Sequence, residues 1–154
     1  MASWIKRQPA FSDVRAPITD MKFAPKHIGL LLVLCAQSGD VKIYECPEVF
    51  CSNAWTLVNP EVKTNLSSCS SCSWSTCYNL PILLALGSDE TNTSTDKLVV
   101  FEFNENNRTF IKIDKSDICT QPIRSLAFAP SVGKLYHTLA IASKALSVVT
   151  IKPT

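Results

Sequence analysis

The cysteines are the residues of this chain best suited to chemistry, and three of them lie close together in the sequence. Cys69-x-x-Cys72 is followed by Cys77. A zinc site needs four ligands, which usually come from two such pairs or from one pair with histidines. The chain has no second pair of this kind, and its only histidines are His27 and His137. Cysteine is also a small, readily buried hydrophobe, so core packing is the better interpretation. The odd separation of Cys69 and Cys72 predicts that a strand would place them on opposite faces.

The histidines and the acidic residues give no stronger chemical signal. A cysteine nucleophile would need His27 or His137 close in space as a base, and no motif supports that geometry. Asp89-Glu90 with Asp96 lacks the regular alternation of a calcium-binding loop. We therefore predict no catalytic residue, no metal site and no cofactor. The polar loop 89–96 is expected to be mobile, solvent-exposed and dispensable for folding.

An internal repeat organises the chain. The segment 17–25 begins with Pro-Ile and ends with Phe-Ala-Pro, and the segment 122–130 does the same. A degraded copy lies between them at 69–76. Each copy is followed by an apolar run and then by a second apolar strand, so the unit is a β-meander. The period of about fifty residues is close to that of propeller blades with four strands, which run roughly 40–45 residues.

These units predict an all-β fold, a partial WD-repeat β-propeller of about three blades that does not close. Propellers use about four to eight blades, so we interpret the chain as a fragment, a truncated product or a piece completed by a partner. Aromatic residues at repeat-equivalent places are expected to pack within the blades. Phe23 and Phe128 should anchor two blade cores; the other aromatic positions are Trp4, Trp55 and Trp74. The predicted segments are an outer strand of a preceding blade at 3–8, blades at 17–62 and 66–115, and a blade lacking its outer strand at 120–154.

Composition narrows the class of partner. The 154 residues carry a net charge of +2, which is too small to predict nucleic-acid binding. The longest apolar run, 28–36, is far shorter than the roughly 20 residues that span a bilayer, so we predict a buried strand and no membrane insertion. Charge at Lys6-Arg7 argues against a signal peptide, and seven cysteines cannot all pair within the chain. Both features favour a reducing compartment.

The blade residues resemble a known family. Three stretches carry the resemblance: Met21 to Leu30, Val41 to Glu45, and Phe101 to Arg108. They are similar to the Seh-type nucleoporins, which are Sec-thirteen-like WD-repeat proteins of the nuclear pore scaffold. The chain departs from the general WD pattern because it lacks a Trp-Asp dipeptide; the corresponding pairs are Tyr44-Glu45, Phe101-Glu102 and Val149-Thr150.

The resemblance implies a non-enzymatic scaffold subunit of the Y-shaped nuclear pore subcomplex, located at the nuclear envelope. It implies an α-helical nucleoporin as partner. It also implies a second role with GATOR subunits at the lysosomal surface, in TOR signalling. No partner-binding residue can be carried over from the family to this chain. The alternatives are a COPII-type vesicle coat subunit and a generic WD-repeat interaction adaptor.

Overall fold

The computed structural model describes residues 1–4, 11–47, 55–58, 62–113, 118–130 and 133–153. Within these ranges the chain forms antiparallel sheets, and its one helical element is a short 3-10 turn at Lys26–Ile28. No helix in the described part is long and apolar enough to cross a membrane. The first sheet has the order β1-β2-β3-β4, with strands β1 Ile18–Phe23, β2 Leu31–Ala36, β3 Val41–Glu45 and β4 Thr56–Leu57.

The other two sheets repeat this plan along the chain. The second sheet has the order β5-β6-β7-β8, and the third has the order β11-β10-β9. In every sheet consecutive strands pair, so each is a meander. The strands are β5 Ser71–Trp74, β6 Ile82–Gly87, β7 Leu98–Asn104, β8 Thr109–Ile113, β9 Ser125–Phe128, β10 His137–Ala142 and β11 Leu146–Ile151.

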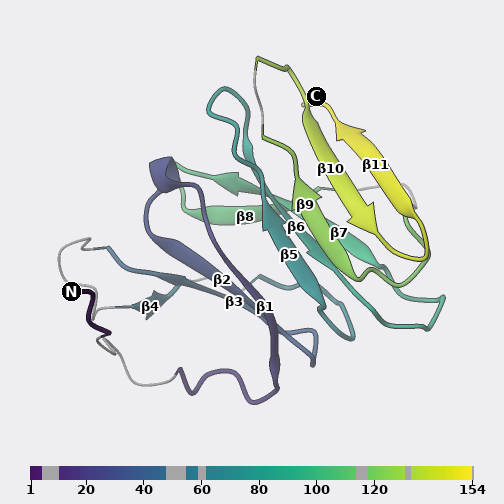
Figure 1. The fold of residues 1–154 in the computed structure, drawn as a ribbon, viewed down its shortest axis with the longest axis horizontal. Coiled ribbons are helices and arrows are strands. Elements are labelled where there is room, and N and C mark those ends of the chain that lie inside the picture. The colour runs from purple at the N-terminus through teal and green to yellow at the C-terminus, as the bar shows by residue number, and fades with distance from the viewer. Residues whose placement is uncertain (5–10, 48–54, 59–61, 114–117, 131–132, 154) are drawn as a thin grey trace.

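The sheets are arranged side by side through their first strands. Strand β5 packs between β1 and β9, so the first strands of the three sheets are neighbours (Figure 1). Three successive meanders without closure confirm the predicted all-β, partial propeller. Each sheet lies within one of the predicted blades. The first and last residues of each blade, at 17–62, 66–115 and 120–154, stay predictions. The expected strand at 3–8 falls largely outside the described residues.

The local sequence explains the first sheet well. The apolar run after Gly29 forms β2, and all but one of its six residues are buried, as predicted for a strand covered on both faces. The turn from β2 to β3 needs Gly39, whose φ is +84°. A Cβ atom at this glycine would lie 2.0 Å from the carbonyl oxygen of Leu66, so close backbone approach also requires glycine here.

Two apolar cores lie between the sheets. The first includes Leu31, Val33, Trp74, Leu84 and Phe101, which come from the first and second sheets. The second core joins the second and third sheets through residues that include Leu83, Val100, Ile123, Leu139 and Ile141. Each sheet is therefore stabilised chiefly by the apolar face it shares with its neighbour.

Candidate functional site: the seams between sheets and the open face of β1

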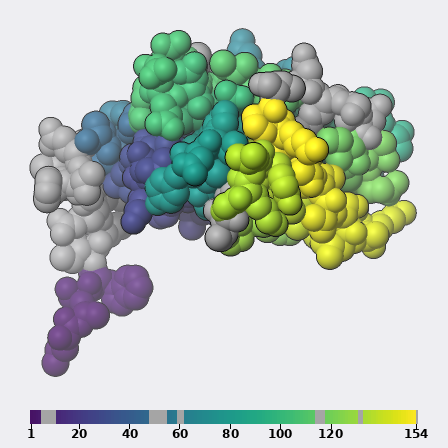
Figure 2. Space-filling view, turned by 90° about the horizontal axis from the view of Figure 1, so that it is seen from above, coloured from purple at the N-terminus to yellow at the C-terminus, as the bar shows by residue number. Residues whose placement is uncertain are grey.

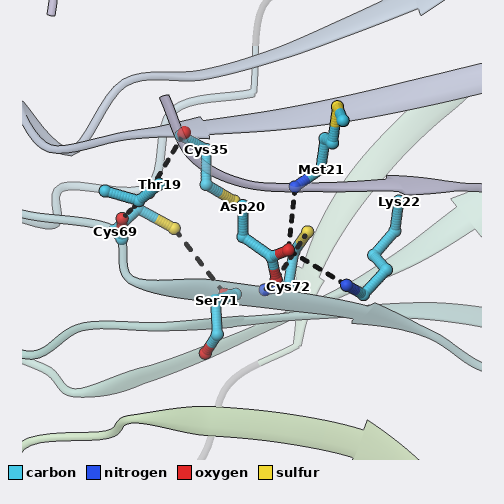
Figure 3. Close-up of polar contacts among 8 residues, drawn as sticks. All are labelled: Thr19, Asp20, Met21, Lys22, Cys35, Cys69, Ser71 and Cys72. Atoms are coloured by element: carbon cyan, nitrogen blue, oxygen red, sulfur yellow. Dashed lines mark hydrogen bonds and ion pairs between the residues drawn. The ribbon is translucent and has the colours of Figure 1, made fainter. Parts of the chain in front are cut away.

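The cysteines form a buried cluster at the seam between the first two sheets. Cys69 and Cys72 are buried, as predicted, and Cys35 of β2 is buried in the same core. The thiol of Cys69 donates to the carbonyl oxygen of Ser71, and the thiol of Cys72 donates to the carboxylate of Asp20 (Figure 3). The neighbouring thiols of Cys69 and Cys72, together with burial, raise the pKa of Cys35. A protonated, buried thiol is a poor nucleophile, so the cluster is built for packing.

The prediction that Cys69 and Cys72 lie on opposite faces is wrong. Strand β5 begins at Ser71, so Cys69 precedes the strand and escapes its alternation. Sequence reasoning also missed Cys35, which is distant in the chain. Within the described ranges, no group of three or more His, Cys, Asp or Glu side chains could hold a metal ion.

Polar side chains of β1 fasten the first sheet to the second. The carboxylate of Asp20 accepts hydrogen bonds from the backbone N–H of Cys72 at 2.9 Å and from the Lys22 ammonium at 3.0 Å (Figure 3). Burial raises the pKa of Asp20, but these hydrogen bonds outweigh it and hold the pKa below its usual value. The hydroxyl of Thr19 donates to the carbonyl oxygen of Cys69 across the same seam.

The second seam, which lies between the second and third sheets, has the same kind of hydroxyl contact. Ser70 lies at the repeat position of Thr19, and its hydroxyl donates to the carbonyl oxygen of Ile123 at 2.7 Å. Ile123 in turn lies at the repeat position of Cys69. The two seams therefore share one contact. In each, the hydroxyl at the repeat position of Thr19 donates a hydrogen bond to the backbone carbonyl oxygen at the repeat position of Ile123 in the next sheet. The repeat alignment pairs Thr19 with Ser70, and this shared hydroxyl is the sequence signal that could have predicted the two contacts.

The second seam also packs closely. The backbone N–H of Ile123 donates to the carbonyl oxygen of Ser88 at 2.8 Å. A Cβ atom at Gly87 would lie 2.7 Å from Cγ2 of Ile123, so only glycine lets the third sheet approach this near. Phe128 donates its N–H to Ser73 Oγ at 3.0 Å. Backbone and side-chain contacts together fix the register of neighbouring sheets.

Strand β1 presents an apolar surface that no sheet among the described residues covers. Ile18, Met21 and Phe23 are 52%, 61% and 62% exposed, and we call these three residues the open face of β1. The prediction that Phe23 anchors a blade core is therefore wrong for the described chain. The repeat equivalents in the second sheet, Cys69, Cys72 and Trp74, are all buried. The difference arises because the first sheet covers this face of β5, whereas no sheet among the described residues covers the equivalent face of β1.

The other predicted aromatic positions differ in their packing. Trp74 is buried, and its ring lies 6.0 Å from that of Phe110. Trp55 is half-buried and lies 6.2 Å from Phe23. Phe128 is half-buried against the second core. Trp4 is fully exposed, in the N-terminal residues that stand apart from the body of the molecule (Figure 2), so packing was the wrong prediction for this residue.

The two histidines lie in different surroundings, and neither has a cysteine as its described contact. His27 is exposed, and its ring lies 4.4 Å from that of Tyr78. His137 begins β10, is buried and lies 6.0 Å from Phe128. Burial lowers the pKa of His137, although a hydrogen bond to the backbone of Pro81 acts in the opposite direction. These contacts give no support to a cysteine–histidine pair.

The polar loop 89–96 is exposed, as predicted, and it has more internal structure than its composition suggested. Glu90 accepts hydrogen bonds from the N–H groups of Thr91 and Asn92. Lys97 is buried beneath the loop, and its ammonium donates to the carbonyl oxygen of Asn92 and to Thr95 Oγ1. The loop therefore supplies the partners of a buried charge.

Comparison with known proteins supports the resemblance seen in the sequence. No protein-family model matches the chain. Nucleoporin SEH1 of Homo sapiens is 41% identical over 97% of this chain, and nucleoporin seh1 of Drosophila melanogaster is also 41% identical over 97%. Nucleoporin SEH1 of Osmerus mordax is 40% identical over 99%. In each case the matched region is 42% of the relative, so the chain spans less than half the length of these relatives. The similarity to Seh nucleoporins is confirmed across nearly the whole chain.

Proposed function

We propose that this chain acts as a non-enzymatic scaffold element of the nuclear pore, in the Y-shaped subcomplex at the nuclear envelope. Three relatives named as nucleoporins, similar over nearly all of the chain, support this assignment. The seams support it physically, because they hold the sheets in a fixed arrangement through packing and hydrogen bonds. A scaffold needs rigid surfaces of this kind and no reacting group.

The open face of β1 carries the proposal. Three large apolar side chains stand more than half exposed on one strand, although their equivalents in the second sheet are buried. Contiguous exposed apolar surface of this kind marks a protein-interaction site. The resemblance implies an α-helical nucleoporin as the partner but no binding residue, and we assign this partner to the open face of β1 because of its exposure alone.

A binding measurement between the purified chain and the purified α-helical nucleoporin tests this assignment. The double variant Met21→Glu with Phe23→Glu places charges on the open face and should weaken binding at least about tenfold, which corresponds to about 1.4 kcal/mol. Ile111→Glu is the matched control, because Ile111 is 53% exposed on β8, away from this face. Equal loss in both variants, or no binding by the unmodified chain, would contradict the proposal.

The role with GATOR subunits at the lysosomal surface follows from the family resemblance alone. This role would also be that of a non-enzymatic scaffold. Binding of purified GATOR subunits to the Met21→Glu, Phe23→Glu variant and to the Ile111→Glu control therefore tests it in parallel. The COPII-type coat subunit remains the alternative with the same architecture. The relatives named above are nucleoporins, and this favours the pore over the coat.

A further inference from the structure

A buried histidine lies in the second seam. His137 begins β10, is 5% exposed, and its ring lies 6.0 Å from that of Phe128 on β9. Its imidazole hydrogen-bonds to the backbone of Pro81, which directly precedes β6 of the second sheet. His137 therefore fastens the third sheet to the second at the first residue of β10.

The contacts of the His137 ring assign its proton. Proline has no backbone N–H, so Pro81 accepts this hydrogen bond through its carbonyl oxygen and the imidazole donates it. Nε2 is buried and has no hydrogen-bond partner among the described residues, so Nδ1 is the donor. In a neutral imidazole the other nitrogen carries a lone pair. A second proton can therefore bind only at Nε2.

The nearest side chains around His137 are largely apolar. Leu83 of β6, Ile113 of β8 and Ile151 of β11 line the same groove as the imidazole, and they come from both sheets of the seam. A proton on Nε2 would place a charged N–H group in these surroundings without an acceptor. Burial of an unpaired charge, or of an unpaired donor, is costly.

Two charged side chains line this groove from other elements. Glu102 lies on β7, and Lys152 directly follows β11. The neighbouring strand β9 contributes Phe128, which does not titrate. The two charges are opposite, and neither is a cause of the pKa shift of His137, which comes from burial and from the hydrogen bond to Pro81. The described surroundings therefore provide no net compensation for an imidazolium.

Two backbone amides report on the two ends of the second seam. Phe128 donates its N–H to Ser73 Oγ at 3.0 Å, at the end where His137 lies. Ile123 donates its N–H to the carbonyl oxygen of Ser88 at 2.8 Å, at the other end of the seam and next to the last residue of β10. Neither group of the Ile123 contact titrates. A proton on His137 should therefore affect the two amides differently.

We propose that protonation of His137 opens its end of the second seam and leaves the Ile123 end closed. A doubly protonated ring must reach water or an acceptor, and this requires the ring to leave Pro81 and Phe128. The third sheet then separates locally from the second in mildly acidic conditions, which is the range in which histidine titrates. This device does not depend on the nuclear pore assignment or on the open face of β1.

The direction of the pH effect follows from burial. Burial lowers the pKa of His137, so the open form of the seam binds the proton more tightly than the closed form. The stability of this contact is fully present above the ordinary histidine pKa near 6.5 and is lost as pH falls from there toward the lower folded value. In that window each unit of pH favours the open form by up to about tenfold.

Hydrogen exchange of the two amides in the full chain, followed by NMR between pH 7 and pH 5, tests the proposal. Protection factors are compared, because they correct for the intrinsic pH dependence of exchange. The protection factor of the Phe128 amide should fall at least about fivefold, and that of the Ile123 amide should stay within about twofold. Equal changes at the two amides, or no change at Phe128, would overturn the proposal.

Three neutral variants separate His137 from the other groups that could titrate in this range. His137→Asn keeps an amide donor for Pro81 and cannot be protonated, so the fall at Phe128 should disappear. Glu102→Gln and His27→Asn should both retain the fall. A fall that persists in His137→Asn, or that Glu102→Gln abolishes, would assign the effect to another group and contradict the proposal. If His137→Asn does not fold, the two amides of the unmodified chain and of Glu102→Gln still decide the question.

Discussion

Two isoleucines at repeat-equivalent positions provide a matched test of how the seams stabilise the fold. Ile18 is 52% exposed on the open face of β1, and Ile123 is fully buried in the second seam. Ile123→Ala leaves a cavity beside Gly87, and such substitutions cost about 2–5 kcal/mol of unfolding free energy. Complete burial of an isoleucine contributes about 1.5–3 kcal/mol, so the half-buried Ile18 should lose about 1 kcal/mol when it is truncated to alanine.

Urea unfolding of the two variants, followed by far-ultraviolet circular dichroism, measures this difference. The chain keeps its three tryptophans in both variants, so fluorescence provides a second probe of the same transition. We expect Ile123→Ala to be less stable than Ile18→Ala by at least about 1 kcal/mol, with unchanged m-values. Equal losses, or a larger loss at Ile18, would refute the claim that a neighbouring sheet buries Ile123 and leaves Ile18 open.

Three further predictions concern side chains at or near the seams. The pKa of Asp20 is lowered on folding, so the stability it contributes is present above its unfolded pKa near 3.8 and is lost as pH falls through the lower folded value. Melting temperatures of the unmodified chain should therefore fall more steeply below pH 4 than those of Asp20→Asn, and parallel curves would contradict this. A thiol reagent should label half-buried Cys119 quickly and Cys35 slowly in the native state, because Cys35 is buried and its pKa is raised. Mass spectrometry locates the label, and equal labelling rates at the two cysteines would count against the buried cluster. Deleting 91–95 should lower the melting temperature of the chain, because the deletion removes the hydrogen-bond partners of the buried Lys97 ammonium. The same deletion should lower the melting temperature less in the Lys97→Met background. Thermal unfolding measures both, and an equal loss of stability in the two backgrounds would argue against this cause.

The repeat made the fold predictable from the sequence. Two copies of Pro-Ile and Phe-Ala-Pro, each followed by apolar strands, located the successive meanders. Burial on the first strand of each sheet was not predictable in the same way. Phe23 and Trp74 occupy equivalent places, but whether each is covered depends on a neighbouring sheet, which is a tertiary property.

The seam contacts show a second limit of sequence reasoning. Asp20 and Cys72 come from different sheets, and nothing local in either segment indicates their hydrogen bond. Cys35 joins the Cys69–Cys72 pair only because β2 packs beside β5. The alternation rule failed for Cys69 because it assumed a strand that starts before Ser71. Repeat alignment could have located Thr19 and Ser70, since both supply a hydroxyl at the same place.

The central claim is that this chain joins the nuclear pore scaffold through the open face of β1. The most direct measurement is affinity purification of the tagged chain from cells, with the unmodified form compared with the Met21→Glu, Phe23→Glu variant and the Ile111→Glu control. Mass spectrometry should find the α-helical nucleoporin and other Y-subcomplex subunits with the unmodified chain and the control, and not with the double variant. Recovery of vesicle coat subunits in their place, or equal recovery of pore subunits with all three forms, would contradict the account.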